Sequence, residues 1–195
     1  ILGHWKNVND GQVFTHWHWQ YDPDPEAEVI YGVDFGFARD PAAVVKVSKK
    51  GRRLWIQEVI YQTGLINEDL AKMMLQKGVP SNATIIADSA EPKSIETLRR
   101  LGFRNIRPAV KGPDSIRAGI DAIRSYEVYA DPVCFNLRLE YDNYAYRAGT
   151  DKPIDDWCHL LDALRYAVGT GMQVGSNSGY VLMGARSKSR DLLTF

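Results

Sequence analysis

The chain has 195 residues, of which 45% are hydrophobic and 25% are charged. This is the composition of an ordinary globular domain, so it excludes extensive disorder, collagen-like repeats and coiled coils, and the length favours one domain. With 24 basic and 24 acidic residues the formal net charge is zero, so a nucleic-acid partner has to be bound by local basic clusters rather than by a global field.

No apolar run approaches the ~18 residues that cross a bilayer, and the first thirty residues lack the layout of a signal peptide. We therefore expect a soluble protein without a membrane partner. The two cysteines, Cys134 and Cys158, form neither a CxxC pair nor a zinc-type array with histidines. We expect both to be reduced core thiols of an intracellular protein.

The two ends of the chain differ in composition from its middle. Residues 1–28 are rich in Trp and His and end in a Pro/Asp stretch that continues neither a helix nor a central strand, which indicates a linker or the trailing edge of an upstream domain. Residues 171–195 are Gly/Ser-rich with several basic residues, which suggests a flexible tail. The folded domain is expected over residues 29–170.

The predicted elements follow a definite order along this domain. Three apolar runs of strand length, joined by short turns, predict an antiparallel meander, and helices and strands then alternate. The predicted strands cover residues 29–36, 42–47, 53–61, 83–87, 106–110 and 128–130. The predicted helices cover residues 67–77, 94–101, 115–126 and 137–148, with a last helix from Asp155 to about Gly169. This order predicts an α/β fold with a mixed sheet flanked by helices, and the absence of GxGxxG disfavours a parallel Rossmann sheet.

Two aspartates accompany apolar strands. Asp34 lies inside an apolar run, where a carboxylate loses hydration unless hydrogen bonds or a metal ion compensate for it. Asp88 ends the run of residues 84–88, and by itself it is equally typical of a turn or a helix cap. If the first strand of the meander neighbours the strand that ends at Asp88, the two carboxylates come side by side.

The last predicted helix carries a polar stripe. At ~100° per residue, Asp155, His159, Asp162 and Tyr166 share one side, opposite an apolar face. Such a stripe alone is typical of a helix side that faces water. Placed across from the two strand aspartates, it predicts a divalent-metal site, and its oxygen-rich donors suit Mg²⁺ or Mn²⁺ better than zinc.

Three segments resemble the nuclease domain of bacteriophage large terminase subunits. They are residues 33–43 (VDFGFARDPAA), 87–92 (ADSAEP) and 159–166 (HLLDALRY). The resemblance covers about residues 28–170 and implies an RNase H-like fold and a metal-dependent, largely sequence-nonspecific endonuclease that cuts concatemeric DNA during genome packaging. Residues 3–5 and 11–14 are also similar to the end of the family's ATPase domain. Since no GxxxxGK[ST] loop is present, we expect the nuclease half alone.

Carried over position by position, the resemblance implies that Asp34, Asp88 and Asp162 bind two Mg²⁺ or Mn²⁺ ions, with His159 as their catalytic neighbour. Two ions ~4 Å apart would activate a water and stabilise the entering and leaving oxygens of a phosphodiester. Whether His159 ligates a metal, orients water or hydrogen-bonds a carboxylate stays open at this point. The resemblance also implies double-stranded DNA as substrate, the host cytoplasm as location, and an ATPase domain, the portal and the small terminase as partners of the full-length protein.

Two basic clusters are candidates for DNA binding. One lies at the tip of the predicted hairpin, and the other extends over residues 99–111 and ends at Lys111. The hairpin cluster consists of Lys49, Lys50, Arg52 and Arg53. Each cluster is large enough for several phosphate contacts, and ordinary solvated surface is the competing interpretation. Neither contains a base-reading motif, so we expect cutting that is independent of sequence.

Three other functions compete with the terminase interpretation. Transposases, integrases and Holliday-junction resolvases place acidic residues on a similar sheet, but residues 34–41 and the HLLDALRY helix favour a terminase. An actin-like nucleotide-binding module needs a phosphate loop after its first strand, and residues 37–40 supply none. A purely structural DNA-binding role remains if one of the acids is misplaced.

Overall fold

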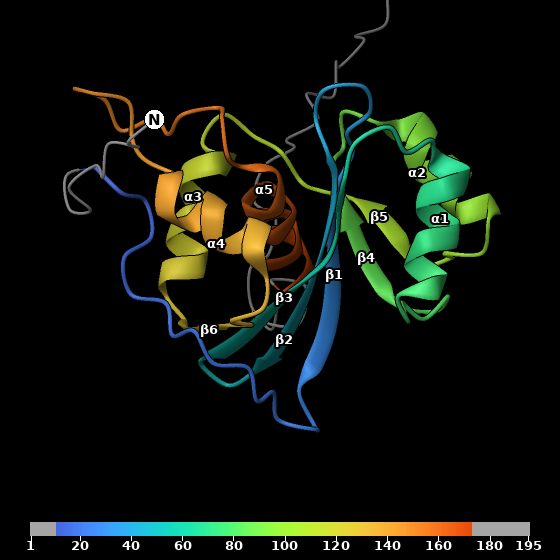
Figure 1. Cartoon of the computed structure of the whole chain (residues 1–195), viewed down its shortest axis with the longest axis horizontal. Coiled ribbons are helices and arrows are strands. Elements are labelled where there is room, and N and C mark those ends of the chain that lie inside the picture. Colours follow the sequence, from blue (N-terminus) through green and yellow to red (C-terminus); the bar gives the residue numbers. More distant parts are fainter. Residues whose placement is uncertain (1–10, 173–195) are drawn as a thin grey trace, which may run out of the picture.

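The computed structural model describes residues 11–172. The ATPase-like residues 3–5 and nearly all of the expected tail lie outside the described residues. Six strands form one mixed sheet with helices on both of its faces, which confirms the predicted fold class (Figure 1).

The sheet contains the predicted meander at its centre. The strands are β1 (Glu28–Asp34), β2 (Ala42–Lys50), β3 (Arg53–Gln62), β4 (Thr84–Ala87), β5 (Ile106–Pro108) and β6 (Glu127–Ala130). Their order across the sheet is β5-β4-β1-β2-β3-β6. β2 is antiparallel to both of its neighbours, β1 and β3, whereas β4 is parallel to β1, β5 to β4 and β6 to β3. The first strand of the meander therefore neighbours β4, as the argument for paired aspartates required.

Helices divide into two layers, one on each face of the sheet. The first layer contains α1 (Asn67–Gln76) and α2 (Pro92–Arg100), and the second contains α3 (Ser115–Arg124), α4 (Phe135–Asn143), α5 (His159–Tyr166) and the short π-helix η1 (Ala167–Gly171) (Figure 1). Side chains along β1 alternate between the two faces of the sheet. Ile30 packs in the core under α5, while Tyr31 and Val33 pack in the core under α1 and α2.

At Gly32 the backbones of β1 and α5 come into direct contact. A Cβ atom added to Gly32 would lie 1.9 Å from the carbonyl oxygen of Ala163, so only glycine permits this approach. Side chains alternate along a strand, so Asp34 points to the same face as residue 32, toward α5. The close approach therefore places the first turn of α5, with His159 and Asp162, beside Asp34.

The last helix begins four residues later than predicted. It starts at His159, because Pro153 pairs with Tyr146 in an isolated bridge and Trp157 has a φ of 57°, a left-handed value that an α-helix does not contain. The prediction that Asp155 belongs to the polar stripe is therefore wrong. The extended segment that pairs with residue 153 also ends α4 before the predicted residue 148.

The described part of residues 1–28 packs on the domain. Val13 and Phe14 are buried in the core under α3 and α4, and Trp17 lies against that core. His18 forms a parallel bridge with Tyr129 at the β6 edge of the sheet. Residues 11–19 thus complete one side of the hydrophobic core.

Both cysteines, Cys134 and Cys158, are buried free thiols, as predicted. No helix of residues 11–172 is long and apolar enough to cross a membrane.

Candidate metal centre

Asp34 and Asp88 lie side by side at the ends of two neighbouring parallel strands. Asp34 is the last residue of β1, and Asp88 follows β4 directly. Val33 is paired with Ala87 in the parallel register, and the Asp88 N–H donates to the Val33 carbonyl at 3.0 Å. The sheet topology therefore brings together two carboxylates that are 54 positions apart in the sequence.

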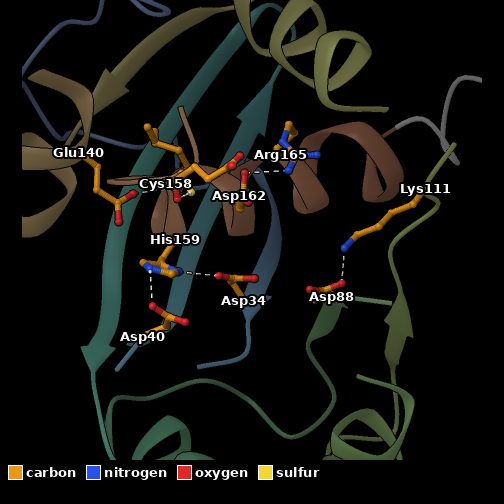
Figure 2. Close-up of polar contacts among 11 residues, drawn as sticks. Asp34, Asp40, Asp88, Lys111, Glu140, Cys158, His159, Asp162 and Arg165 are labelled. Atoms are coloured by element: carbon orange, nitrogen blue, oxygen red, sulfur yellow. Dashed lines mark hydrogen bonds and ion pairs between the residues drawn. The ribbon is translucent and has the colours of Figure 1, made fainter. Parts of the chain in front are cut away.

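α5 contributes the other two predicted residues. His159 Nδ1 lies 3.1 Å from an oxygen of Asp34, and its Nε2 lies 3.9 Å from an oxygen of Asp40 (Figure 2). Asp162 follows three residues later on the same side of the helix. Only 22% of the His159 side chain and 23% of the Asp162 side chain are exposed, so this stripe faces the strand acids rather than bulk water.

The environment of Asp34 favours a positive charge. Burial raises the pKa of Asp34 to about 6, the hydrogen bond with His159 opposes this rise, and the negative charges of Asp162 and Asp88 add to it. The pKa of His159 is also raised, chiefly by its hydrogen bond with Asp34. A cation bound among these acids would remove the repulsion and the desolvation cost together.

Each of the two outer acids is paired with a basic side chain. Lys111 Nζ binds Asp88, whose same carboxyl oxygen also accepts the Ala90 N–H at 2.8 Å (Figure 2). Arg165, on the last turn of α5, donates from Nη2 to Asp162 at 2.7 Å. These two cations balance the outer acids, while among residues 11–172 the central Asp34 is paired with the imidazole alone.

The donor set fits a divalent ion by its chemistry. Within residues 11–172, no three His, Cys, Asp or Glu side chains are close enough to hold a metal ion in the present arrangement. However, the charges of Asp162 and Asp88 both reach Asp34, where they add to the effect of burial on its pKa, and carboxylate oxygens are the ligands that Mg²⁺ and Mn²⁺ prefer. Asp34, Asp88 and Asp162 are thus suited to such ions once the outer acids turn from their basic partners.

One buried carboxylate near this centre was missed by the sequence analysis. Glu140 of α4 is fully buried, and its Oε2 accepts the Leu161 N–H in the first turn of α5 at 3.0 Å. Its other oxygen has no hydrogen-bond partner among the described residues, and burial raises its pKa to about 7. Since α5 has no capping side chain of its own, Glu140 caps it from α4. The sequence signal for a buried Glu140 was its helical spacing with Leu137 and Tyr141, two α4 residues that are also buried.

The predicted hairpin cluster lies far from the acids. Lys49 pairs with Glu28 at the start of β1, whereas Asp34 ends that strand, so about 20 Å of strand separates the two sites at ~3.3 Å per residue. The structure therefore places Lys49, Lys50, Arg52 and Arg53 at the opposite end of the sheet. Among the predicted DNA-binding residues, Lys111 alone contacts a predicted metal ligand in the described part of the chain.

Much of the hairpin charge is balanced locally. Lys50 binds Asp24 at 2.8 Å and Glu26 at 2.9 Å, and Arg53 lies 3.3 Å from Glu127. The other two basic residues of the cluster have no acidic partner among residues 11–172. Two positive charges of this cluster thus remain for an outside anion.

Comparison with known proteins identifies the family. The family model described as the terminase RNase H-like domain matches residues 34–170. The terminase large subunit of Bacillus phage SPP1 is 34% identical over 161 residues, which cover 75% of this chain and 37% of that protein. The PBSX phage terminase large subunit of Bacillus subtilis is 30% identical over 145 residues, which cover 70% and 33%. The chain therefore spans about a third of the length of these relatives.

Solved structures agree with this result. The nuclease domain of the SPP1 large terminase, g2p, with bound Mn has a TM-score of 0.64 at 30% identity, over 76% of this chain and 86% of that one. The P22 large terminase nuclease domain has a TM-score of 0.64 at 16% identity, over 82% and 92%, and shows the same fold. The magnesium-bound nuclease of phage G20c has a TM-score of 0.60 at 16% identity, over 82% and 97%. Because the family model matches more than half of its length, the chain belongs to the family of terminase RNase H-like domains.

Proposed function

We propose that this domain is a metal-dependent endodeoxyribonuclease that cuts concatemeric phage DNA during genome packaging. The observation that carries the proposal is the placement of Asp34 and Asp88 at the ends of adjacent parallel strands, across from His159 and Asp162 on α5. The Mn bound to the SPP1 nuclease domain and the magnesium bound to the G20c nuclease support divalent ions as cofactors.

In this proposal Asp34, Asp88 and Asp162 hold two Mg²⁺ or Mn²⁺ ions. When bound, such ions supply an activated water and a counter-charge for the entering and leaving oxygens of the phosphodiester. Asp34 would be the central acid of this set, since it ends β1 beside Asp88 and lies across from α5. Its burial excludes bulk water from the centre and strengthens each electrostatic interaction there.

His159 is assigned the role of orienting Asp34. Its Nδ1 lies at hydrogen-bond distance from the carboxylate, and this hydrogen bond is the chief cause of the raised pKa of the imidazole. Cleavage by His159→Ala, measured in Mg²⁺ and in Mn²⁺, tests the assignment. An equal loss with both metals supports orientation, whereas a larger loss in Mg²⁺ than in saturating Mn²⁺ identifies a metal ligand, because the affinity for Mg²⁺ is already marginal.

We further propose that the substrate is double-stranded DNA, cut with little regard to sequence. Contacts to phosphates carry no sequence information, and the candidate basic residues are of that type. The domain would work in a longer terminase chain with an ATPase domain and with the portal and small terminase as partners, in the host cytoplasm. The two large-subunit relatives, of which it spans about a third, support this context.

Plasmid cleavage by the purified chain tests the proposal. We expect degradation with Mn²⁺ and Mg²⁺, none with EDTA, and a smear rather than discrete fragments at the limit of digestion. Intact plasmid in both metals would contradict nuclease activity. Sequence-defined fragments would instead indicate a resolvase-like enzyme.

A further inference from the structure

A cavity lies next to the basic partners of the two outer acids of the metal centre. It has a volume of about 370 Å³ and is bounded by the loop after β5, the N-terminus of α3, and the junction of α5 with η1. Lys111 and Arg165, the two basic partners of those acids, both line it. The cavity therefore adjoins the metal centre and presents two positive charges.

Both cations are held in place by one aromatic ring. Lys111 Nζ lies 4.9 Å and Arg165 Cζ lies 5.1 Å from the ring centre of Tyr166, distances at which a cation is attracted to the ring. Tyr166 itself is buried. Both positive charges therefore lie close to this one ring, and each is balanced by its own acid, Asp88 or Asp162.

Arg165 has donors to spare. Its side chain is only 7% exposed, one N–H group is committed to Asp162, and its Nε is buried without a hydrogen-bond partner among the described residues. A guanidinium offers five N–H donors in a planar fork that matches the oxygens of a phosphate. Nε is sealed from the cavity, so the terminal nitrogens of the fork are the donors that a ligand there can meet.

The remaining walls suit a phosphate group. Gly112 and Gly169 leave the backbone accessible, while Gly119 is buried against the Arg165 side chain. The hydroxyl side chains of Ser115 and Thr170 also line the cavity. Ser115 is the first residue of α3, and its own N–H donates to the Gly112 carbonyl at 3.1 Å. The next N–H groups of this first turn and the helix dipole favour an anion. Acidic side chains are absent from this lining in the described part of the chain.

We propose that this cavity binds a backbone phosphate of the DNA next to the phosphate that is cut, with Lys111 and Arg165 as its cationic ligands. This inference rests on the proposed nuclease function and adds a substrate subsite to it. Ions bound to Asp88 and Asp162 would take over the counter-charge role, so both cations would become free to bind phosphate. Metal and DNA would then bind cooperatively.

Gly112 provides the sharpest test. A Cβ there would meet no heavy atom within 4 Å, so the isosteric pair Gly112→Asp and Gly112→Asn differs in charge alone. We expect Gly112→Asp to weaken duplex binding, measured by fluorescence anisotropy of the 195-residue chain in Ca²⁺ and in EDTA, at least tenfold more than Gly112→Asn. Equal affinities of the two variants would overturn the subsite.

Lys111→Ala gives a second, independent measurement. Losing one phosphate contact should lower the slope of log affinity against log salt by about 0.9, whereas the control Lys72→Ala, on the exposed side of α1, should leave it unchanged. An unchanged slope for Lys111→Ala overturns the proposal. Neither binding assay needs cleavage. Variants that cut normally and bind duplex as the wild type does would refute the subsite alone. A wild-type chain that never cuts would refute the nuclease function alone.

The source of the phosphate is decided by amide NMR spectra of the labelled chain. Shifts at Gly112, Gly119 and Gly169 on adding a short duplex support a DNA subsite, whether or not inorganic phosphate shifts them too. Shifts with inorganic phosphate and none with duplex would assign the cavity to a free anion and overturn the DNA assignment.

Discussion

The two ends of the central sheet carry charge in different ways. At the end where β1 and β4 finish, acidic side chains are buried and adjacent, and Asp34 is 8% exposed. At the β2–β3 hairpin the charged side chains are exposed, with 44% of Lys50 and 60% of Arg53 accessible, and these two have acidic partners in Asp24 and Glu127. Exposed ion pairs of this kind contribute little and are screened by salt, whereas buried like charges need a counter-charge. The burial of charged side chains is therefore a stronger indication of function than the number of charged residues in a stretch of sequence.

Removing the central acid should have the largest effect. Asp34→Asn is expected to reduce cleavage more than ~100-fold, beyond the loss that residues supporting a metal ligand cause. The metal-free variant should be at least as thermally stable as the wild type, because the substitution removes a buried charge whose pKa is raised. Plasmid nicking and thermal unfolding measure the two effects.

Asp142→Asn, which removes an exposed carboxylate on α4, is the matched control and should cut normally. A folded Asp34→Asn protein with full activity would contradict the metal centre itself. It would leave the two ends of the sheet without a functional difference.

Glu140 tests whether buried charge at the acid end also acts through α5. Glu140→Ala removes the cap and should cost roughly 1–3 kcal/mol of unfolding free energy, with a fall in kcat as His159 and Asp162 lose their fixed position. Glu140→Gln keeps an oxygen acceptor for the Leu161 N–H and should restore most of both properties. Urea unfolding and steady-state cleavage are the measurements. Equal losses in the two variants would show that the negative charge, and not the cap, is what matters.

The pH dependence of stability should also distinguish the two ends. Asp34, Glu140 and His159 all have raised pKa values, so the folded state binds their protons more tightly than the unfolded state. Each contributes stability that is complete below its unfolded pKa and is lost as the pH rises through its folded pKa. Without metal, the Tm should therefore be a few degrees higher at pH 5.5 than at pH 8.

Saturating Mn²⁺ should remove or reverse this trend, because ions bind the deprotonated acids. Asp34→Asn should show a shallower pH dependence than the wild type in EDTA. A Tm that does not change between pH 5.5 and 8 would mean that the acid end is less strained than its burial indicates.

Charge reversal at the hairpin should have the smallest effect. The double variant Arg52→Glu/Arg53→Glu is expected to weaken duplex binding only a few-fold, since Arg53 already has a partner in Glu127, and to leave Mn²⁺ affinity unchanged. The control Lys72→Glu/Lys77→Glu makes the same change in net charge, on α1 and at its C-cap. Anisotropy with DNA measures the difference. Identical affinities of the two double variants would assign the hairpin to ordinary surface, and a loss larger than that of Lys111→Ala would make it the main DNA contact.

The sequence by itself determined the order of the elements, the antiparallel meander and the motifs that contain Asp34, Asp88, His159 and Asp162. These depend on local periodicity and on short segments, which a single sequence displays directly. It also determined the family, because those motifs occur in the family's order and the family model matches residues 34–170.

Only the tertiary structure decided where α5 begins, what caps it and which cations meet which acids. The start of α5 depends on the bridge between Tyr146 and Pro153, and its cap comes from Glu140 on another helix. The helical periodicity of the sequence does not mark where α5 begins, because it contains no information about partners distant in the chain. The approach of α5 to Gly32, and the 20 Å or so of strand between the hairpin and the acids, follow from packing and register. These are properties of the assembled sheet, and no segment carries them alone.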